Sequence, residues 1–346
     1  MTTFADQVYQ YGGMPVGVGG LPFPPTGKAF FVDPAVGSDG NSGKKPTEAL
    51  DTLYKAHSLC TAGKNDVVYL MGDGSTTATA RLSLANAVSI DSTATTGVLT
   101  WSKAATHLIG ITAPTSIASR ARIAPPTGTY TRTTFNSGNF VVVSAQGCHF
   151  ANFSVFHGFS TGGASMIAWT DSGGRNCYQN VSIQGGGDTA SNTTNVATMR
   201  SLLVTGSVGE NTFRGCSIGT DTVPAGRSTG SQEIELAGGT PRNRFESCVI
   251  STYAGAAGCV WVLIAGSGID RYVLFRDCMF TNPVLPATAA NATAMTVGMT
   301  VNAAAGGTVH VMNSMFYGAS SMSTSALVFS NLPAANAKGG LGVVAT

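Results

Sequence analysis

A six-residue pattern of apolar and polar positions recurs along the chain from residue 150 onward. It is clearest at Phe245–Ile250 (FESCVI): an apolar residue, a variable one, a small turn-former, a Cys, a variable residue and an apolar one. Looser or equal copies start 28, 35, 32, 30 and 36 residues apart and together comprise Phe150–Val155, Tyr178–Ile183, Phe213–Ile218, Phe245–Ile250, Phe275–Phe280 and Val311–Phe316. A unit that recurs with variable gaps predicts a solenoid, in which each unit is one turn and the insertions lie in loops.

A second apolar segment precedes each hexad and predicts a further strand in every turn. These segments are 141–143, 166–169, 202–204, 233–236, 260–264 and 299–301, with a seventh at 327–329. Each of the first six leads into a hexad through a short turn that contains Gly, Ser or Asn. Continuous apolar runs such as Val260–Ile264 predict strands buried on both faces. We therefore expect two strands per turn, with loops such as 185–195 and 286–293 closing the spiral.

Stacking the hexads in register predicts columns of side chains, because neighbouring strands in a sheet lie about 4.8 Å apart. The fourth position carries three thiols, expected to lie above one another in the interior: Cys216, Cys248 and Cys278. Small buried thiols that fill a tapered core are expected, because disulfides fit poorly between parallel strands in register.

Two polar columns are also expected. The second hexad position carries Gln179 and then an outward stack of opposite charges: Arg214, Glu246 and Arg276. Exposed pairs of this kind stabilise little but penalise slipped registers, which bring like charges together. Two residues before three of the hexads stands an asparagine, which predicts a ladder of side-chain amides bonded rung to rung at a turn: Asn176, Asn211 and Asn243.

The first 28 residues are expected to form an extended arm. Their glycines and prolines stop a helix or strand from propagating, and Asp6 is their only acidic residue. The arm nevertheless carries apolar side chains that cannot bury themselves: Phe4, Val8, Tyr9, Tyr11, Met14, Leu21 and Phe23. We expect these seven residues to dock on a partner chain, the alternative being that the arm packs back on its own body.

Residues 29–74 are expected to hold an entry strand, a capping helix and the first rung. Leu50, Leu53, Ala56, His57 and Cys60 fall on one stripe at helical spacing. Thr47 is a plausible N-cap, and Gly63 suits a left-handed position after the helix. An amphipathic helix over about 50–62 would cover the open end of the solenoid and its strand edges. The body is then expected over 75–330, with early irregular rungs that include a strand at 106–111, and a tail over 331–346.

The same segment resembles the entry to the pectate-lyase-like right-handed parallel β-helices. The resemblance rests on Phe30–Gly43 (FFVDPAVGSDGNSG), Leu50–Cys60 (LDTLYKAHSLC) and Asp66–Leu70 (DVVYL). It covers about 45 residues and departs from the family at Glu48-Ala49, where a Pro-aromatic pair is usual. It implies an all-β fold, a single right-handed parallel β-helix with an N-terminal capping helix and an extended N-terminal arm. The motif identifies a fold more than an activity.

Composition narrows the class of protein. Charged residues make up 10% of the 346 residues, the net charge is +2, and there are 44 glycines. Such a chain gives no electrostatic footprint for nucleic acid, and it has no apolar run of about 18 residues that would span a membrane. Its N-terminus lacks the basic and apolar regions of a signal peptide, so assembly in a cytoplasm is expected, which suits seven cysteines kept as thiols.

Candidate catalytic groups are sparse. Glu233 and Glu235 fall on one face of one strand, where a carboxylate pair could act on a glycan, although an exposed polar face explains them as well. Asp171, Arg175 and Asp188 form a thinner candidate for a Ca²⁺-assisted lyase site. Neither set stands out from an ordinary surface, so we assign no catalytic residue and expect a non-enzymatic protein.

The remaining candidates are read as structural, and no cofactor or metal is expected. Asp33 and Asp39 could bind an ion, but Asx turns explain them more simply. Of the five histidines (His57, His107, His149, His157 and His310), only His149 and His157 approach a ligand spacing, so packing is expected for all. Trp169 and Trp261 could stack on sugars if they faced outward, although Trp in a strand usually lies in the core.

A chemically quiet solenoid with an apolar arm looks like a virion component of a phage or phage-like particle. We expect a capsid decoration or cement protein, assembled in the host cytoplasm, whose arm docks on the major capsid protein or another virion protein. β-helical proteins of this kind usually form trimers, so a homotrimer is expected. The alternative is a tailspike-like depolymerase that binds or cleaves a host surface glycan.

Overall fold

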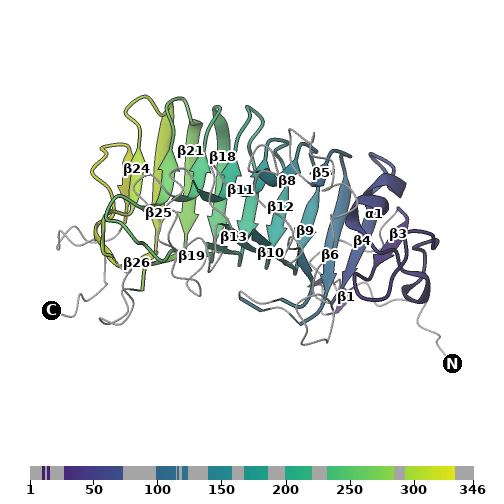
Figure 1. The fold of residues 1–346 in the computed structure, drawn as a ribbon. Coiled ribbons are helices and arrows are strands. Elements are labelled where there is room, and N and C mark those ends of the chain that lie inside the picture. The colour runs from purple at the N-terminus through teal and green to yellow at the C-terminus, as the bar shows by residue number, and fades with distance from the viewer. Residues whose placement is uncertain are drawn as a thin grey trace.

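The computed structural model describes residues 10–11, 14–15, 27–72, 99–113, 115–116, 119–123, 139–157, 167–185, 199–219, 232–283 and 293–331. The chain forms a right-handed parallel β-helix, as the repeats and the resemblance predict. Its strands stack along one axis, with the helix α1 at the N-terminal end (Figure 1).

Three parallel sheets form the sides of the solenoid within the described residues. The first, called the long sheet here, has ten strands: β3 (Ala29–Val32), β4 (Asp66–Met71), β6 (Thr106–Ile111), β9 (His149–Ala151), β12 (Cys177–Gln179), β15 (Thr212–Arg214), β18 (Thr240–Glu246), β21 (Ile269–Arg276), β25 (Gly307–Met312) and β28 (Val328–Ser330). The second sheet comprises β7 (Arg122–Ile123), β10 (Ser154–His157), β13 (Ser182–Gly185), β16 (Ser217–Gly219), β19 (Val249–Ser251), β22 (Met279–Thr281) and β26 (Met315–Tyr317).

The third sheet comprises β5 (Leu99–Trp101), β8 (Asn139–Val143), β11 (Ile167–Asp171), β14 (Arg200–Val204), β17 (Gln232–Leu236), β20 (Val260–Ile264) and β24 (Met299–Val301). Two short pairs complete the strands that the structure describes: β1 (Gln10–Tyr11) with β2 (Met14–Pro15), and β23 (Met295–Val297) with β27 (Ala319–Ser321). The apolar segments that precede the hexads are the strands of this third sheet.

Each hexad is a corner between two sheets, so a turn has three strands and the expectation of two was wrong. The first two residues end a strand of the long sheet, and the last two lie in a strand of the second sheet. The third residue bends the chain with a positive φ of 49° to 60° in every copy: Asn152, Asn180, Gly215, Ser247, Asp277 and Asn313. Small residues that tolerate this left-handed conformation make a one-residue corner, and an apolar pattern does not reveal such a break.

The interior is filled by columns of like side chains. Aromatic rings from successive strands of the long sheet stack with centroids 4.5 to 5.0 Å apart: Phe150, Tyr178, Phe213, Phe245 and Phe275. Trp169 and Trp261 are buried in the same core, so neither offers a face to a sugar. Burial of these large apolar side chains is the main favourable term in the stability of the fold.

The capping helix forms, but it is shorter than expected. Helix α1 spans Leu53–Leu59, and Pro46–Glu48 forms a separate 3₁₀ turn, which places Thr47 outside the helix. The N-cap is Thr52, whose hydroxyl accepts a hydrogen bond from the Lys55 amide at 3.1 Å. Gly63 has a φ of +74° and lies three residues beyond the C-cap, Cys60. Leu53, Ala56 and His57 are buried against the first rungs, so the helix covers the end of the core.

A lysine that is distant in the sequence caps the other end of this helix. The Lys103 ammonium donates to the carbonyl oxygens of His57, Ser58 and Cys60 at 2.8, 2.6 and 2.7 Å. These are carbonyls that a helix end leaves without partners, and a cation also opposes the negative end of the helix dipole. The contact ties the cap to the rung that carries Trp101.

Most of the arm lies outside the described residues, and so does the tail beyond residue 331. Of the seven arm residues singled out above, Tyr11 and Met14 lie in β1 and β2, where only the backbone is described. No helix in the described part of the chain is long and apolar enough to cross a membrane. All seven cysteines are described, and each is a free thiol.

Candidate functional site

The two carboxylates of β17, Glu233 and Glu235, are buried rather than exposed on the surface. Glu233 is fully buried, and Glu235 is 8% exposed. The intervening Ile234 and the following Leu236 point into the core, so the two glutamates project from the opposite face of the third sheet. Their shared face agrees with the sequence, whereas their burial departs from the exposed polar face that was expected.

Glu235 is held by neighbours on its own strand and on the preceding rung. Its carboxylate forms an ion pair with Arg200 of β14 and accepts a hydrogen bond from the Gln232 side chain at 2.9 Å. Both charged side chains are at most 17% exposed. Burial lowers the pKa of Arg200, because removal from water disfavours the guanidinium cation.

Glu233 is held by a hydroxyl and enclosed by a glycine. The Ser201 hydroxyl donates to the Glu233 carboxylate at 2.5 Å and accepts a hydrogen bond from the Gly185 amide at 2.9 Å. Gly219 packs directly against this carboxylate: a Cβ there would lie 2.7 Å from a Glu233 oxygen, and its φ is +91°. The pair therefore joins three rungs by charge and hydrogen bonds, and both glutamates are buried in this conformation.

Asp171 does not form a site with Arg175, which corrects the second catalytic candidate. Its carboxylate is buried, with one oxygen accepting from the amides of Gly173 and Gly174, both at 3.0 Å. The other oxygen accepts from the Asn176 amide at 3.0 Å and the Tyr178 hydroxyl at 2.5 Å. Burial raises the pKa of Asp171, and these donors oppose that rise. The Arg175 side chain pairs instead with Glu210, and Asp188 lies outside the described residues.

The aspartates of the entry loop serve turns and the helix start. Asp33 accepts from the amides of Ala35 and Val36, which is the expected Asx turn. One oxygen of Asp39 accepts from the amides of Asp51 and Thr52, and the other from the Thr52 hydroxyl. Burial and the nearby Asp39 and Asp33 raise the pKa of Asp51. Within the described residues, no group of three or more His, Cys, Asp or Glu side chains could hold a metal ion.

His57, His107 and His149 are all buried, and the first two are held as neutral rings. His57 accepts from the amides of Ser102 and Lys103 through Nε2, and burial, assisted by the Lys103 charge, lowers its pKa to about 4. His107 accepts from the His149 amide through Nδ1, and burial, with a smaller effect of His149, lowers its pKa to about 4. His310 lies on the outer face of the long sheet, and the side chain of His157 is outside the described part.

The asparagine column runs from side chain to backbone. The side-chain oxygens of Asn176, Asn211 and Asn243 accept from the backbone amides of Cys148, Asn176 and Asn211, respectively, at 2.8 to 3.1 Å. All three residues are buried. The expected ladder of side-chain amides is therefore a chain in which each Asn accepts from the backbone of the preceding rung.

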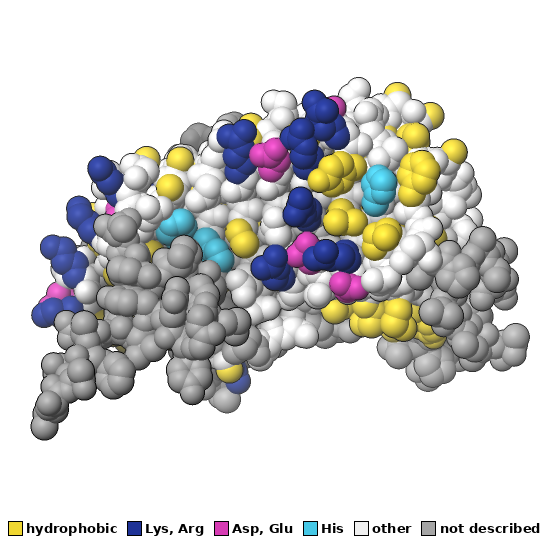
Figure 2. Space-filling view, turned by 180° about the vertical axis from the view of Figure 1, so that it is seen from behind, with side chains coloured by type: hydrophobic (Ala, Val, Ile, Leu, Met, Phe, Trp, Pro, Cys, Tyr) yellow, Lys and Arg dark blue, Asp and Glu magenta, His cyan; other side chains and the backbone are white. Residues whose placement is uncertain are grey.

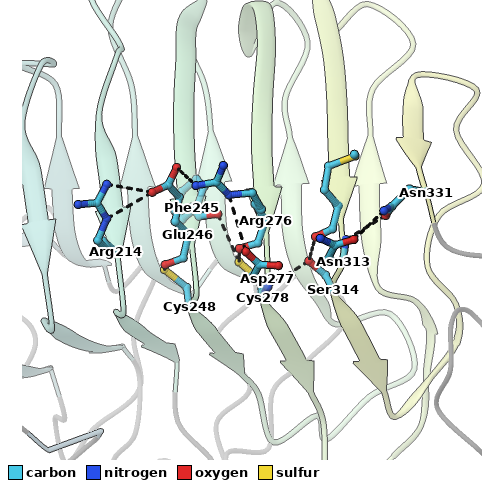
Figure 3. A network of polar contacts seen from close by, with 11 residues as sticks. Arg214, Phe245, Glu246, Cys248, Arg276, Asp277, Cys278, Asn313, Ser314 and Asn331 are labelled. Carbon is cyan, nitrogen blue, oxygen red and sulfur yellow. Dashed lines mark hydrogen bonds and ion pairs between the residues drawn. The ribbon is translucent and has the colours of Figure 1, made fainter.

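The charged column lies on the outer face, with Glu246 between two arginines (Figure 3). Its carboxylate contacts Arg214 at 3.1 Å and Arg276 at 2.9 Å. Beneath it, each of the three thiols, Cys216, Cys248 and Cys278, lies 3.4 to 3.5 Å from a carbonyl oxygen of the preceding rung, as expected for S–H donors. A hydrogen bond with Cys248 and burial raise the pKa of Cys278, so this thiol stays protonated.

A second ladder of the same kind was missed in the sequence. Glu210 contacts Arg175 at 3.2 Å and Arg242 at 2.8 Å. All three residues have positive φ values; Arg175 and Glu210 stand just before β12 and β15, and Arg242 lies within β18. The signal was available, since Arg175, Glu210 and Arg242 each stand immediately before the corresponding Asn of the buried column.

An open groove lies on the outer face of the last rungs of the long sheet. We call it the aromatic groove; it has a volume of about 510 Å³ and is lined by Tyr272, Leu274, Arg276, His310, Met312 and Asn313. Figure 2 shows hydrophobic side chains and a histidine gathered beside arginine or lysine side chains on this face. The alternation of strands β21 and β25 could have indicated these residues, but the hexads drew attention to the corner.

Comparisons with known proteins show the fold. No protein-family model matches the sequence, and no curated protein matches it either. Among solved structures, a rhamnogalacturonan lyase is similar with a TM-score of 0.51 and 14% identity over 84% of this chain and 69% of the lyase. A pectate lyase is similar with a TM-score of 0.54 and 13% identity over 84% of this chain and 63% of that protein. At such identities the likeness establishes the parallel β-helix and leaves the activity open.

Proposed function

We propose that the protein is a non-enzymatic structural component of a virion, a capsid decoration or cement protein. Its N-terminal segment would dock on the major capsid protein or another virion protein, while the β-helix projects. The observation that carries the proposal is the pairing of outward charges between rungs. Glu246, Glu210 and Glu235 each bind an arginine of a neighbouring rung. These ion pairs keep the strands of neighbouring rungs in register, and a solenoid that is fixed in this way is suited to projecting rigidly from a viral particle.

The proposal includes a homotrimer located in the virion and assembled in the host cytoplasm. Three copies would bring three apolar arms to one attachment point, which raises the effective strength of a weak docking segment. The seven arm residues named above would supply this contact, because their side chains are apolar and their segment carries one acid.

Deletion of residues 2–25 tests the attachment. The truncated protein should fold, since the cap and the rungs follow the deletion, and it should no longer co-sediment with particles. A variant with Tyr54→Ser, an exposed residue on the cap, serves as the control and should co-sediment normally. Undiminished particle binding by the deletion variant would contradict the proposal, and electron microscopy would show where the chain is attached.

A second candidate function is that of a tailspike-like protein that binds or cleaves a host glycan. The similarity to proteins named as polysaccharide lyases favours it. Cleavage would require the β17 carboxylates to become accessible, so Glu233→Gln should abolish product formation, while Glu210→Gln on the other ladder should not. Screening the unaltered protein for release of unsaturated or reducing sugar ends decides this candidate; no release from the host's surface glycan rejects catalysis.

A further inference from the structure

The outer face of the long sheet changes character over its last three rungs. One outward column runs in register from Arg244 to Leu274, His310 and Phe329. The next column runs from Glu246 to Arg276 and Met312. The paired charges of the middle rungs thus give way to rings and apolar chains. Leu274, Phe329 and Met312 carry no charge that could pair between rungs, so the register argument made for the charged column does not explain them.

The rings in this region form a connected surface. The Tyr272 and His310 rings meet edge to face with centroids 6.1 Å apart, and His310 stacks on Phe329 at 5.6 Å. The Thr308 hydroxyl lies 3.0 Å from Nε2 of His310 and helps to hold the ring in place. Phe329 is 52% exposed and Met312 is 37% exposed. Tyr272 and His310 are half-buried on the outer face, so part of each ring is open to solvent and neither belongs to the core.

Cationic and amide groups border these rings. Arg244 lies beside Leu274, is exposed, and has no ion pair within the part of the chain that the structure describes. Arg276 shares Glu246 with Arg214, and half of its side chain remains exposed. Asn313 uses its backbone amide and its side-chain oxygen to bind Asn331, which leaves its side-chain NH₂ group to donate elsewhere.

We propose that the aromatic groove is a binding site for an acidic saccharide. A pyranose ring offers an apolar C–H face that packs on the Tyr272 and His310 rings, and its hydroxyls can bond with the Tyr272 hydroxyl and the Asn313 amide. A sugar carboxylate would pair with Arg244, whose planar guanidinium suits that group. The site lies on a different sheet from Glu233 and Glu235, so binding there does not involve that carboxylate pair. This inference does not depend on attachment to a virion.

Binding is tested by calorimetric titration at low salt with defined oligosaccharides. The probes are acidic oligomers of galacturonate, of glucuronate and of sialate, with a neutral galactan oligomer of matched length. At least one acidic probe should bind about tenfold more tightly than the neutral one, which is the effect of one charge-assisted contact. Added salt should weaken this binding, because it screens exposed charges.

Variants locate the site. Tyr272→Ala should weaken binding about tenfold and Arg244→Gln about fivefold, since stacking and one exposed charge contribute effects of that size. Arg214→Gln is the matched control: it removes an arginine from the same face one rung further from the groove, and its binding should stay within about twofold. Thermal melts before titration show that each variant is folded.

Several outcomes would overturn the inference. They are the failure of all three acidic probes, equal binding of the neutral oligomer, unchanged binding by Tyr272→Ala, or an equal loss in Arg214→Gln. Light scattering on Tyr272→Ala adds another, because a reduced oligomeric state would assign the groove to a contact between copies. Particle binding by the residue 2–25 deletion is measured separately, so either proposal can fail alone.

Discussion

Two columns of polar side chains run along the long sheet, one buried near the starts of its strands and one on its outer face at their ends. The inner column consists of Asn176, Asn211 and Asn243, which accept from backbone amides and are buried. The outer column consists of Arg214, Glu246 and Arg276, and both arginines are at least half exposed. The rung spacing is the same in both columns. If an outer ion pair is lost, water can solvate the remaining charge, whereas water cannot reach the polar groups of a broken inner hydrogen bond. We therefore expect the inner column to stabilise the fold and the outer one mainly to select its register.

The largest effect is expected at Asp171, which anchors the inner column through Asn176. Asp171→Ala leaves four donors without an acceptor, two of them backbone amides, and should lower the free energy of unfolding by about 4 kcal/mol. Chemical denaturation measures the loss. Asp270→Ala, an exposed aspartate beside Arg271, should cost less than about 1 kcal/mol. If both variants lost the same free energy of unfolding, buried polar contacts would not be more stabilising than exposed ones, and the expectation would be wrong.

Lowering the pH should reduce the stability of the fold through its buried histidines and should leave the ion pairs on the surface intact. The pKa values of His57 and His107 are about 4 in the folded protein, below the unfolded value of 6.5. The unfolded chain therefore binds protons first, and stability present above pH 6.5 is lost as the pH falls towards 4. At pH 5 the loss should be roughly 2 kcal/mol for each histidine. The separate ladder of Arg175, Glu210 and Arg242 should remain charged at pH 5, because hydrogen bonds from Arg175 and Arg242 lower the pKa of Glu210.

Denaturation at pH 7 and pH 5 measures this loss, and His107→Gln supplies the check. Glutamine can accept a hydrogen bond without titrating, so the variant should lose about half as much stability between the two pH values. A variant that remains as acid-sensitive as the unaltered protein would show that other groups are responsible.

A smaller effect is expected within the inner column itself. Asn211→Ala deprives the buried Asn176 amide of its acceptor and should cost about 2 kcal/mol. Asn331→Ala is the matched control, because Asn331 makes the same kind of contact to Asn313 at an exposed position and should cost under about 0.5 kcal/mol. Urea titrations of both variants compare the two sites directly.

The smallest effect is expected in the outer column. Glu246→Gln should lower the free energy of unfolding by about 1 kcal/mol or less, and added salt should reduce the difference. Hydrogen exchange on β15, β18 and β21 would reveal a slipped register as lost protection of particular amides. A loss as large as that of Asn211→Ala would mean that the outer ladder carries stability as well as register.

The fold could be predicted because its signals are local and repeated. The hexad occurs six times, which predicted the stacked columns. The entry segment resembles that of known parallel β-helices, which predicted the handedness and the capping helix. The number of strands per turn did not follow, because the break between two strands is one residue such as Ser247 with a positive φ. Apolar periodicity is insensitive to a single bend. The helix start also moved, from Thr47 to Thr52, because Pro46 and Thr47 lie in a 3₁₀ turn.

The candidate sites were harder to predict, because burial on the outer faces depends on what lies over them. Glu233 and Glu235 occupy outward positions of β17. Gly219 nevertheless packs against the Glu233 carboxylate, and Arg200 forms an ion pair with Glu235. Asp171 lies at the end of a strand, where the sequence cannot show that its side chain turns inward to Tyr178. The aromatic groove depends on residues more than 30 positions apart, such as Tyr272 and His310. Spacing within one strand does not bring such residues together.

The one-residue corner has a consequence for how such a chain can change over generations. Six turns pass from the long sheet to the second sheet through one left-handed residue, so an inserted residue there would exchange the inner and outer faces of the strand that follows. The stretches between the second and third sheets differ in length from turn to turn: β13 and β14 are separated by residues 186–199, whereas β19 and β20 are separated by residues 252–259. Lineages of this protein should therefore gain and lose segments along one edge of the rod, and that edge is where new specificities can arise without refolding the rest.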